Sequence, residues 1–382
     1  MAAIGDDLGD VSPLGRRSTL GKIAELLERS GIDVDDVGRV QRVNVWQGFY
    51  KDDDGVAQTV DMSGVVISPK WAEGPAWPVV QPAAPCVIRP QRAQKPDSRS
   101  IRTTVLIPDP QISYHLIDGE LVPTHDEAAI STVLKLVRWL NPQRIVNLGD
   151  FLDLAEWSSK FAVLPEFVQM TQPALDRAHR FLVEQRAAAP MLVEHDLIAG
   201  NHDDRIGKLI LQNARAALRL RQANTPDGWP VMSVPHLLRL DELGVTYHGG
   251  YPAARVRITA GTARQPGLWA IHGQKLDSKA LARSERQSFV QGHAHGVSES
   301  NETFELNGEP IDVAAHFLGC ICRIDGVVPS TKGGFDDRGR PVKRIENWQQ
   351  AIGVVTEHED GSWDLERARI RDGRAWFRGR WF

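Results

Sequence analysis

The sequence predicts an α/β protein with a core of two sheets flanked by helices, preceded by a small α+β module. Strand-like and helix-like segments alternate over residues 101–222, and beyond residue 243 the pattern turns to strands. Such alternation indicates a largely parallel sheet covered by helices, and the strand-rich remainder indicates a second sheet. Residues 69–100 contain seven prolines, a density that excludes helix and central strand. We therefore expect an accessory module over 1–68, a Pro-rich linker over 69–100 and the main domain over 101–382.

In the N-terminal module a helix is expected up to residue 29, because Ser18 or Thr19 is suited to cap it and Gly31 to close it. Strands over 40–50 and 56–67 are expected to form a hairpin, since the acidic, Gly-ended stretch between them is a turn signal. A helix followed by a hairpin is compatible with a winged-helix-like module that binds nucleic acid. Its acidic charge instead favours an accessory packing or protein-contact role.

The main domain is expected to begin with three strands alternating with three helices. The strands span 103–107, 145–148 and 192–199, and the helices span 127–140, 173–189 and 206–222. Further short strands are expected over 245–247, 255–259, 269–271, 288–290, 313–318 and 353–356.

The composition is ordinary for a globular protein and places limits on the partners. The 382 residues carry a formal net charge of −4, which gives no global attraction to nucleic acid or to an anionic membrane. No apolar run approaches a membrane span and no secretory signal opens the chain, so a cytoplasmic location is expected. Three cysteines (Cys86, Cys320 and Cys322) make no disulfide framework, and the last two are expected to be buried, reduced thiols.

Five apolar runs of the main domain each end in a short turn that carries Asp, Asn, Gln or His. Ile145 to Leu148, for example, leads into Gly149-Asp150, with Asp153 three residues further on. Ligands bind beyond the carboxyl ends of strands in open α/β sheets, so these turns are expected to converge. The other four turns carry Asp109 and Gln111; Asn201, His202 and Asp203; His272; and His293 and His295.

Carboxylate, amide oxygen and imidazole together suit a pair of divalent ions such as Mn, Fe, Zn or Ni better than a structural zinc site. Two such ions can clamp a phosphoryl group and lower the pKa of a bound water. A carboxylate that bridges both ions would be the natural centre of the site.

The series Asp109-x-Gln111, Gly149-Asp150-x-x-Asp153, Gly200-Asn201-His202-Asp203, His272 and Gly292-His293-x-His295 resembles the calcineurin-like metallophosphoesterase superfamily. The family pattern is D-x-H, G-D-x-x-D, G-N-H-[D/E], H and G-H-x-H, in this order. The resemblance covers residues 101–325 and implies a four-layer α/β/β/α fold. The layout also resembles phage-encoded members of the family.

The resemblance implies a role for each matching residue. The first metal would be held by Asp109, Gln111, Asp150 and His295, and Asp150 would bridge to a second metal held by Asn201, His272 and His293. His202 would protonate the leaving oxygen, oriented by Asp203, because imidazole titrates near neutrality. Asp153 would hold a ligand in place through a hydrogen bond.

One position departs from the family pattern: Gln111 stands where the family has His. An amide oxygen ligates metals more weakly than imidazole, so the first site is expected to be looser or to prefer a harder ion such as Mn. His115 is an alternative ligand if its loop folds back, and His248 is a rival for the role given to His272. A degraded site in a purely structural domain is the remaining alternative.

The substrate is less well determined by the sequence. Residues 367–382 interleave arginines with aromatic residues, a combination used by nucleic-acid grooves, although a hairpin turned at Asp372-Gly373 with solvent-facing arginines explains the pattern equally well. The expectation is a metal-dependent phosphodiesterase acting on DNA or RNA. The alternatives are a phosphomonoesterase, acting on a phosphoprotein or a nucleotide, and a non-enzymatic binding or assembly protein that keeps the fold. The N-terminal module is expected to contact another protein or nucleic acid.

Overall fold

A computed structural model describes residues 13–33, 37–51, 56–69, 101–158, 169–225, 227–328 and 345–382. The chain divides into two compact units, Met1–Pro85 and Cys86–Phe382. Most of the predicted linker, the turn between the first two strands and residues 159–168 lie outside the described residues. Within the described part of the chain no helix has the length and apolarity needed to cross a membrane.

The described residues of the first unit form a helix and a long antiparallel hairpin. Helix α2 (Pro13–Arg29) begins earlier than predicted, and Gly31 follows it with φ of +66°, a left-handed conformation that closes helices readily when glycine adopts it. Strands β1 (Val37–Lys51) and β2 (Ala57–Pro69) pair from Val37↔Pro69 to Lys51↔Ala57, with register shifts between Val37 and Arg39 and between Val40 and Arg42.

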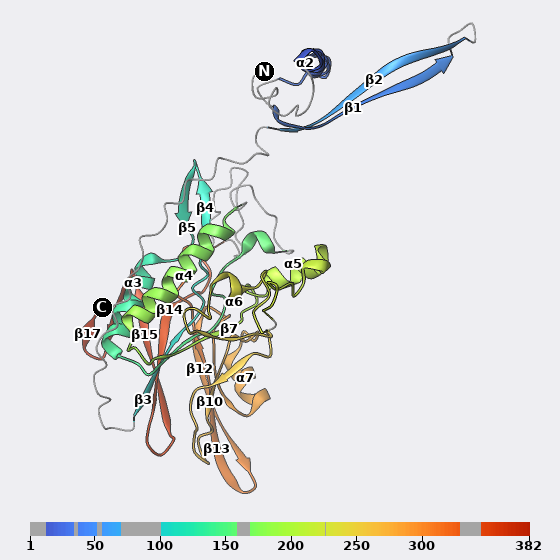
Figure 1. The fold of residues 1–382 in the computed structure, drawn as a ribbon. Helices are drawn as coiled ribbons and strands as arrows, with labels where there is room; N and C mark the ends of the chain where they lie inside the picture. The colour runs from blue at the N-terminus through green and yellow to red at the C-terminus, as the bar shows by residue number, and fades with distance from the viewer. Residues whose placement is uncertain are drawn as a thin grey trace. The chain divides into compact units, whose positions relative to one another are not determined.

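The second unit is built on two sheets, so the prediction of a mixed α/β protein with more than one sheet and with helices is confirmed (Figure 1). Four neighbouring strands of the larger sheet, β3, β6, β7 and β8, run parallel. In spatial order this sheet contains β17 (Arg380–Trp381), β16 (Arg374–Phe377), β15 (Trp363–Arg371), β14 (Gln350–Glu357), β3 (Arg102–Ile107), β6 (Arg144–Asn147), β7 (Glu194–Ile198) and β8 (Thr246–His248).

The smaller sheet has five strands, of which β10, β11 and β13 are parallel. Its order is β12 (Val297–Leu306), β13 (Glu309–Leu318), β11 (Ser288–Gln291), β10 (Leu268–Ile271) and β9 (Arg255–Arg257). A separate hairpin is formed by β4 (Tyr114–Ile117) and β5 (Glu120–Pro123).

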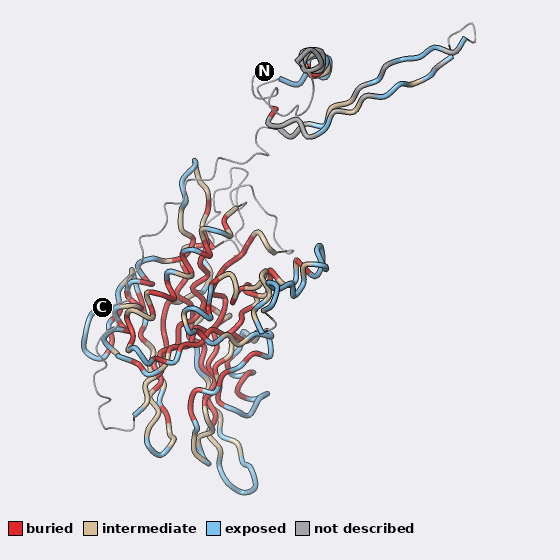
Figure 2. The backbone as a smooth tube through the Cα atoms, viewed as in Figure 1, coloured by how far each residue is buried: buried red, intermediate tan, exposed pale blue. Residues whose placement is uncertain are grey.

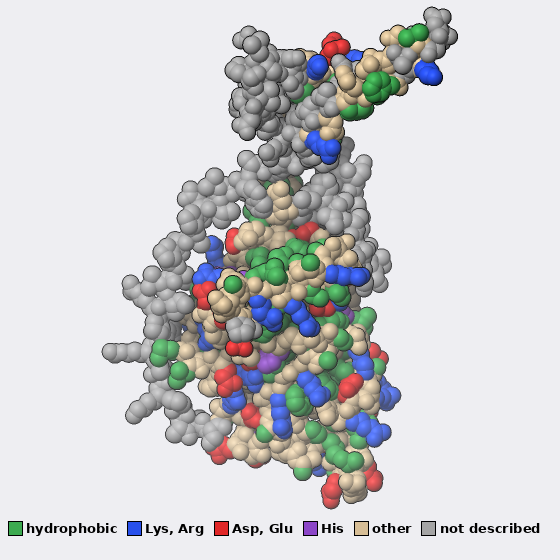
Figure 3. Space-filling view, turned by 45° about the vertical axis from the view of Figure 1, so that its right-hand side comes forward, with side chains coloured by type: hydrophobic (Ala, Val, Ile, Leu, Met, Phe, Trp, Pro, Cys, Tyr) green, Lys and Arg blue, Asp and Glu red, His purple; other side chains and the backbone are tan. Residues whose placement is uncertain are grey.

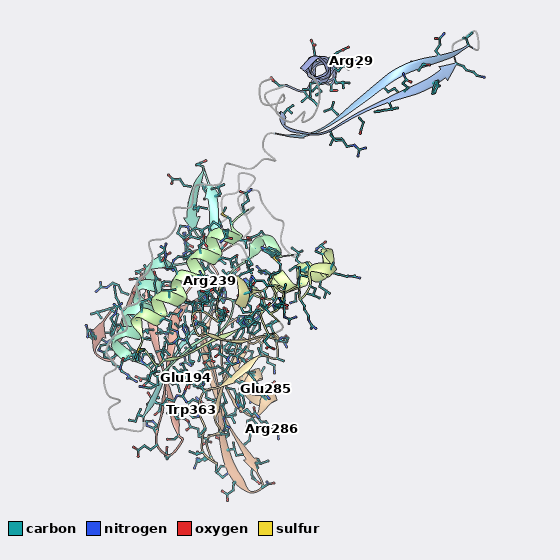
Figure 4. The ribbon with its side chains drawn as sticks, in the orientation of Figure 1. Arg29, Glu194, Arg239, Glu285, Arg286 and Trp363 are labelled. Atoms are coloured by element: carbon teal, nitrogen blue, oxygen red, sulfur yellow. The ribbon has the colours of Figure 1, made fainter. Side chains whose placement is uncertain are left out.

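The side chains of the central strand β3 alternate between two buried layers. On β3, Val105 and Ile107 pack with α3 (Glu127–Leu140) and α4 (Thr171–Ala188), whereas Leu106 faces the second sheet. The layer between the sheets includes Leu106 and Val290 and is bounded by Trp363, labelled in Figure 4 at the start of β15. Helix α7 (Ser278–Glu285) covers the outer face of the smaller sheet through Leu281 and Ala282. Burial is therefore concentrated in the sheets and the adjoining helix faces, as Figure 2 shows.

The helix predicted over 206–222 is shorter than expected. Helix α5 (Arg205–Asn213) ends where Ala214 leaves helical geometry with φ of −144°, and only a 3₁₀ turn, η6 (Arg215–Ala217), follows. Leu218 and Leu220 are exposed, so no packing surface rewards a continued helix there. The remaining short elements are η4 (Ala155–Trp157) and α6 (Val234–Leu237).

Tight turns with left-handed backbone join several antiparallel strands. Asp118-Gly119, Asn307-Gly308 and Asp372-Gly373 each have two positive φ angles between paired strands. Two-residue turns of this kind match the twist of a hairpin and favour Asn-Gly or Asp-Gly. The last of them forms the predicted C-terminal hairpin.

Candidate metal centre

The five predicted strand ends lie together in the second unit. Asp109, Asp150 and Asn201 follow the parallel strands β3, β6 and β7, and His272 and His293 follow β10 and β11 of the other sheet. Residues from both sheets form two groups whose ligand atoms lie within 4.8 Å of one another. These groups are Asp109, Asp150 and His295, and Asp150, His272 and His293.

The first group is buried and contains an unsatisfied acceptor. His295 Nε2 lies 3.2 Å from Asp109 Oδ1 and 3.3 Å from Gln111 Nε2. Gln111 Oε1 is buried without a hydrogen-bond partner among the described residues. Buried oxygens are usually satisfied, so an orphaned acceptor beside a carboxylate and an imidazole fits a cation there. The donor set therefore fits a metal, with Gln111 able to supply an amide oxygen.

In the second group, two side-chain oxygens lie close to one ring nitrogen of His272. His272 Nε2 lies 3.3 Å from Asp150 Oδ1 and 3.0 Å from Asn201 Oδ1. On its other side His272 Nδ1 lies 2.9 Å from the carbonyl oxygen of Leu148, where an N–H donates. Histidines that ligate metals commonly donate their second ring N–H in this way, which fixes the tautomer and leaves the first nitrogen free to coordinate.

Asp150 belongs to both groups, and it also accepts a hydrogen bond at 2.8 Å from the backbone N–H of His202. Burial would raise the pKa of Asp150, but the neighbouring His202 and His272 hold it well below its usual range. Burial would lower the pKa of His272, yet Asp150 raises it to about 9. Burial and His272 together lower the pKa of His293. Metals bind an anionic carboxylate and neutral imidazoles, the states that these shifts favour for Asp150 and His293, so His272 has to give up its proton when an ion binds.

The backbone of the site is held in an uncommon conformation. Five predicted ligands have positive φ angles between 43° and 58°, namely Asp109, Gln111, Asp150, His293 and His295. Non-glycine residues adopt this region rarely, and such strain gathers at functional sites where the surroundings enforce it. Two glycines allow the backbone to lie close to the carboxylates of the site. A Cβ at Gly200 would lie 2.1 Å from Asp150 Oδ1, and a Cβ at Gly292 would lie 2.1 Å from Asp109 Oδ2.

The two remaining carboxylates, Asp153 and Asp203, have partners other than those expected of them. Asp153 Oδ1, not Asp203, contacts His202, at 2.8 Å from Nδ1 but off the direction of a hydrogen bond. Asp203 instead accepts hydrogen bonds from the backbone N–H groups of Gly200, Phe151 and Leu152. The prediction that Asp203 orients His202 is therefore wrong. The turn after β6 brings Asp153 to the imidazole, while Asp203 braces that turn.

The structure also places the two alternative histidine ligands, His248 and His115, outside the two groups. His248 Nε2 lies 2.7 Å from Asp196 Oδ1 and belongs to neither group, so His272 holds the position in the centre. His115 lies on β4 and belongs to neither group, and burial lowers its pKa to about 4.

Sequence reasoning missed two features next to the centre. Cys320, Cys322 and His295 form a third buried group of possible ligands, and both thiols are free. The sequence shows the Cys-x-Cys spacing, but no spacing rule connects these cysteines with His295. The third cysteine, Cys86, lies outside the described residues. Tyr251 is the second feature, because its ring lies 5.7 Å from that of His272, with Lys208 Nζ 5.7 Å from the Tyr251 ring.

No protein-family model matches the chain, and no curated protein matches it.

Proposed function

We propose that this chain is a dinuclear-metal-dependent phosphoesterase of the calcineurin-like metallophosphoesterase superfamily, acting as a phosphodiesterase on nucleic acid. The observation that carries the proposal is Asp150, a buried carboxylate shared by two groups of metal-binding side chains. The layer order also supports the proposal. Helices α3 and α4, the two sheets and α7 follow one another, in agreement with the four-layer arrangement that the resemblance implies.

Each ion would have its own set of donors. Asp109, Gln111, Asp150 and His295 would hold the first, and Asp150, Asn201, His272 and His293 the second. When bound, two divalent ions activate a water molecule and stabilise charge on the phosphoryl oxygens. The nitrogen and oxygen donors suit Mn best, with Fe, Zn and Ni as alternatives.

The chain's own contribution to the reaction lies in His202. Its Nε2 is 3.6 Å from Asp150 Oδ2, and its Nδ1 faces Asp153, so the ring is placed beside the shared carboxylate. From there it would donate a proton to the leaving oxygen of the ester. Asp153 would keep the ring in position, and Asp203 would keep the turn carrying Asp150 in shape.

The proposal is tested by hydrolysis of bis-para-nitrophenyl phosphate in Mn-containing buffer, together with a metal count by mass spectrometry. Asp150→Asn and His293→Ala are expected to reduce hydrolysis to the buffer background, because the first removes the shared negative charge and the second removes an imidazole donor. Asp241→Asn, a change of an exposed aspartate outside the site, serves as the control.

Unchanged turnover in either site variant would refute the assignment. Less than one equivalent of metal, with no hydrolysis in any divalent ion, would instead identify a binding or assembly protein. Comparing a phosphomonoester with single-stranded DNA, duplex DNA and RNA as substrates separates the remaining alternatives.

A further inference from the structure

Strands β16 and β17 form a second hairpin, turned at Arg378-Gly379, which is one edge of the larger sheet and borders a cavity. Strand β17 is the edge strand, and β16, β15 and β14 lie between it and β3. A cavity of about 490 Å³ opens between β17 and the last turns of α3, within the size range of small-ligand sites. Six residues, which we call the C-terminal basic edge, line this cavity or lie beside it: Lys135, Arg138, Trp139, Arg374, Arg380 and Trp381.

Aromatic rings at this edge are exposed and lie close to guanidinium groups. Trp381 is 57% and Trp376 54% exposed, and their ring centroids are 5.3 Å apart. The guanidinium of Arg374 lies 4.8 Å from the Trp381 ring, and that of Arg380 lies 5.4 Å from the Phe382 ring. Large apolar side chains left in water and rimmed by cations are typical of a binding surface.

The cations of the edge are also uncompensated. Among the residues that the structure describes, no carboxylate lies within 4 Å of Lys135, Arg138, Arg374 or Arg380. Arg378, on the same hairpin, shows the contrast, because its Nε donates to Glu366 Oε2 at 2.8 Å. Four cations without a carboxylate partner thus lie together on a chain with net charge −4, and in the view of Figure 3 basic and acidic side chains are interspersed over the surface of the second unit.

Packing of the hairpin against α3 explains the position of some of these aromatic residues but not of all of them. Phe377 and Phe382 pack against Trp139, with ring centroids at 6.4 and 5.2 Å, and Phe377 is 5% exposed. Those contacts attach the hairpin to α3. They do not require an exposed Trp381 or unpaired cations around it.

We propose that the C-terminal basic edge binds single-stranded nucleic acid. Lys135 and Arg138 contact phosphates, and Trp381 stacks on a base, the combination by which single strands are held without sequence preference. The inference rests on the proposed function for its substrate class. The metal centre follows β3 and β6, several strands away, so the edge acts as a tether that holds one part of a strand while another reaches the centre.

The test measures fluorescence anisotropy of labelled oligothymidine and oligouridine with the full-length protein, stripped of metal by EDTA, over a salt series. Trp381→Ala is expected to weaken binding roughly tenfold, whereas Trp381→Phe keeps a stacking face and binds nearly as the wild type. The double change Lys135→Glu with Arg138→Glu is expected to lower the slope of log affinity against log salt by about 1.4, or ~0.7 for each phosphate contact. The control is Lys279→Glu on α7, which covers the other sheet and leaves binding unchanged. The two oligomers distinguish DNA from RNA.

The proposal is overturned if the edge variants bind as the wild type does, or if the wild type binds neither oligomer in a salt-dependent way. It is overturned equally if Trp381→Ala changes the sedimentation of the protein and leaves oligomer affinity intact, because the edge is then a contact between protein chains. Hydrolysis of bis-para-nitrophenyl phosphate does not require the edge. Its absence in a protein that still binds oligomers would refute the proposed function and leave this inference standing.

Discussion

Asp153 and Asp203 are both buried near His202, but they have different partners. Asp153 contacts the imidazole, whereas Asp203 accepts three backbone N–H groups. The motif places Asp203 directly after His202, yet adjacency in sequence points their side chains in different directions. Their roles therefore separate into positioning of a proton donor and support of a turn.

The two roles predict opposite effects of two substitutions on kcat and on the free energy of unfolding. Asp153→Asn is expected to lower kcat on the order of 10- to 100-fold with little change in stability, the usual cost of losing a partner that orients a functional group. Asp203→Ala is expected to lower the free energy of unfolding by about 3 kcal/mol, because it leaves buried amides without acceptors. Steady-state kinetics and urea denaturation of both variants measure this. Equal loss of kcat in both, without loss of stability in the second, would contradict the division.

Among the elements, α3 connects the outer helical layer to the strands of the site. Its N-cap Asp126 accepts hydrogen bonds from the backbone N–H groups of Ala128 and Ala129, and its second oxygen accepts one from Gln350 Nε2 on β14. One residue therefore caps the helix and attaches it to the sheet. Arg177 adds a paired contact from α4 to Glu127, at 2.6 and 2.7 Å.

We predict that Asp126→Ala lowers the free energy of unfolding by about 1–2 kcal/mol, through loss of the cap and of the bond to Gln350. Asp126→Asn keeps an oxygen that can accept from the helix and is expected to recover most of the loss. Chemical denaturation followed by circular dichroism gives both values. An alanine variant as stable as the wild type would show that solvent satisfies this helix end.

For the molecule as a whole, the buried polar group with the clearest effect on stability is His195 on β7. It is 3% exposed, and its Nε2 lies 2.9 Å from Gln185 Oε1. Burial, with a smaller effect of Arg186, lowers the pKa of His195 to about 3. The folded protein therefore keeps this ring neutral, whereas the unfolded chain protonates it below about pH 6.5.

The sign of the pH dependence follows from that difference. The unfolded state binds the additional proton, so the contribution to stability is complete above pH 6.5 and is lost progressively towards pH 3. Between pH 7 and pH 5 we expect His195 to reduce the free energy of unfolding by about 2 kcal/mol. Urea denaturation at a series of pH values measures this. His195→Gln should flatten the dependence, whereas His358→Gln, a change of a histidine outside the core, should not; identical curves for wild type and His195→Gln would contradict the prediction.

Sequence periodicity predicted the buried strands well and the exposed ones poorly. The strands ending at Ile107, Asn147 and Ile198 each contain two or three consecutive apolar residues, and both of their faces are covered. Strands β4, β5 and β12 were missed, since they are partly exposed and carry no such run, whereas the buried half of β13 was predicted over 313–318. Their turns, Asp118-Gly119 and Asn307-Gly308, contained the signal that could have found them.

The sequence alone determined which donors are present and where each stands in the chain, because donor chemistry belongs to the side chain and the ends of parallel strands must meet. Only the tertiary structure decided which donors face each other. The choices of His272 over His248 and of Asp153 over Asp203 depend on backbone paths, such as the left-handed turn at Asp150 and the close approach allowed by Gly200. The placing of Cys320 and Cys322 beside His295 likewise arises from contacts between segments far apart in sequence. Periodicity describes neighbours along the chain, so it does not determine such contacts.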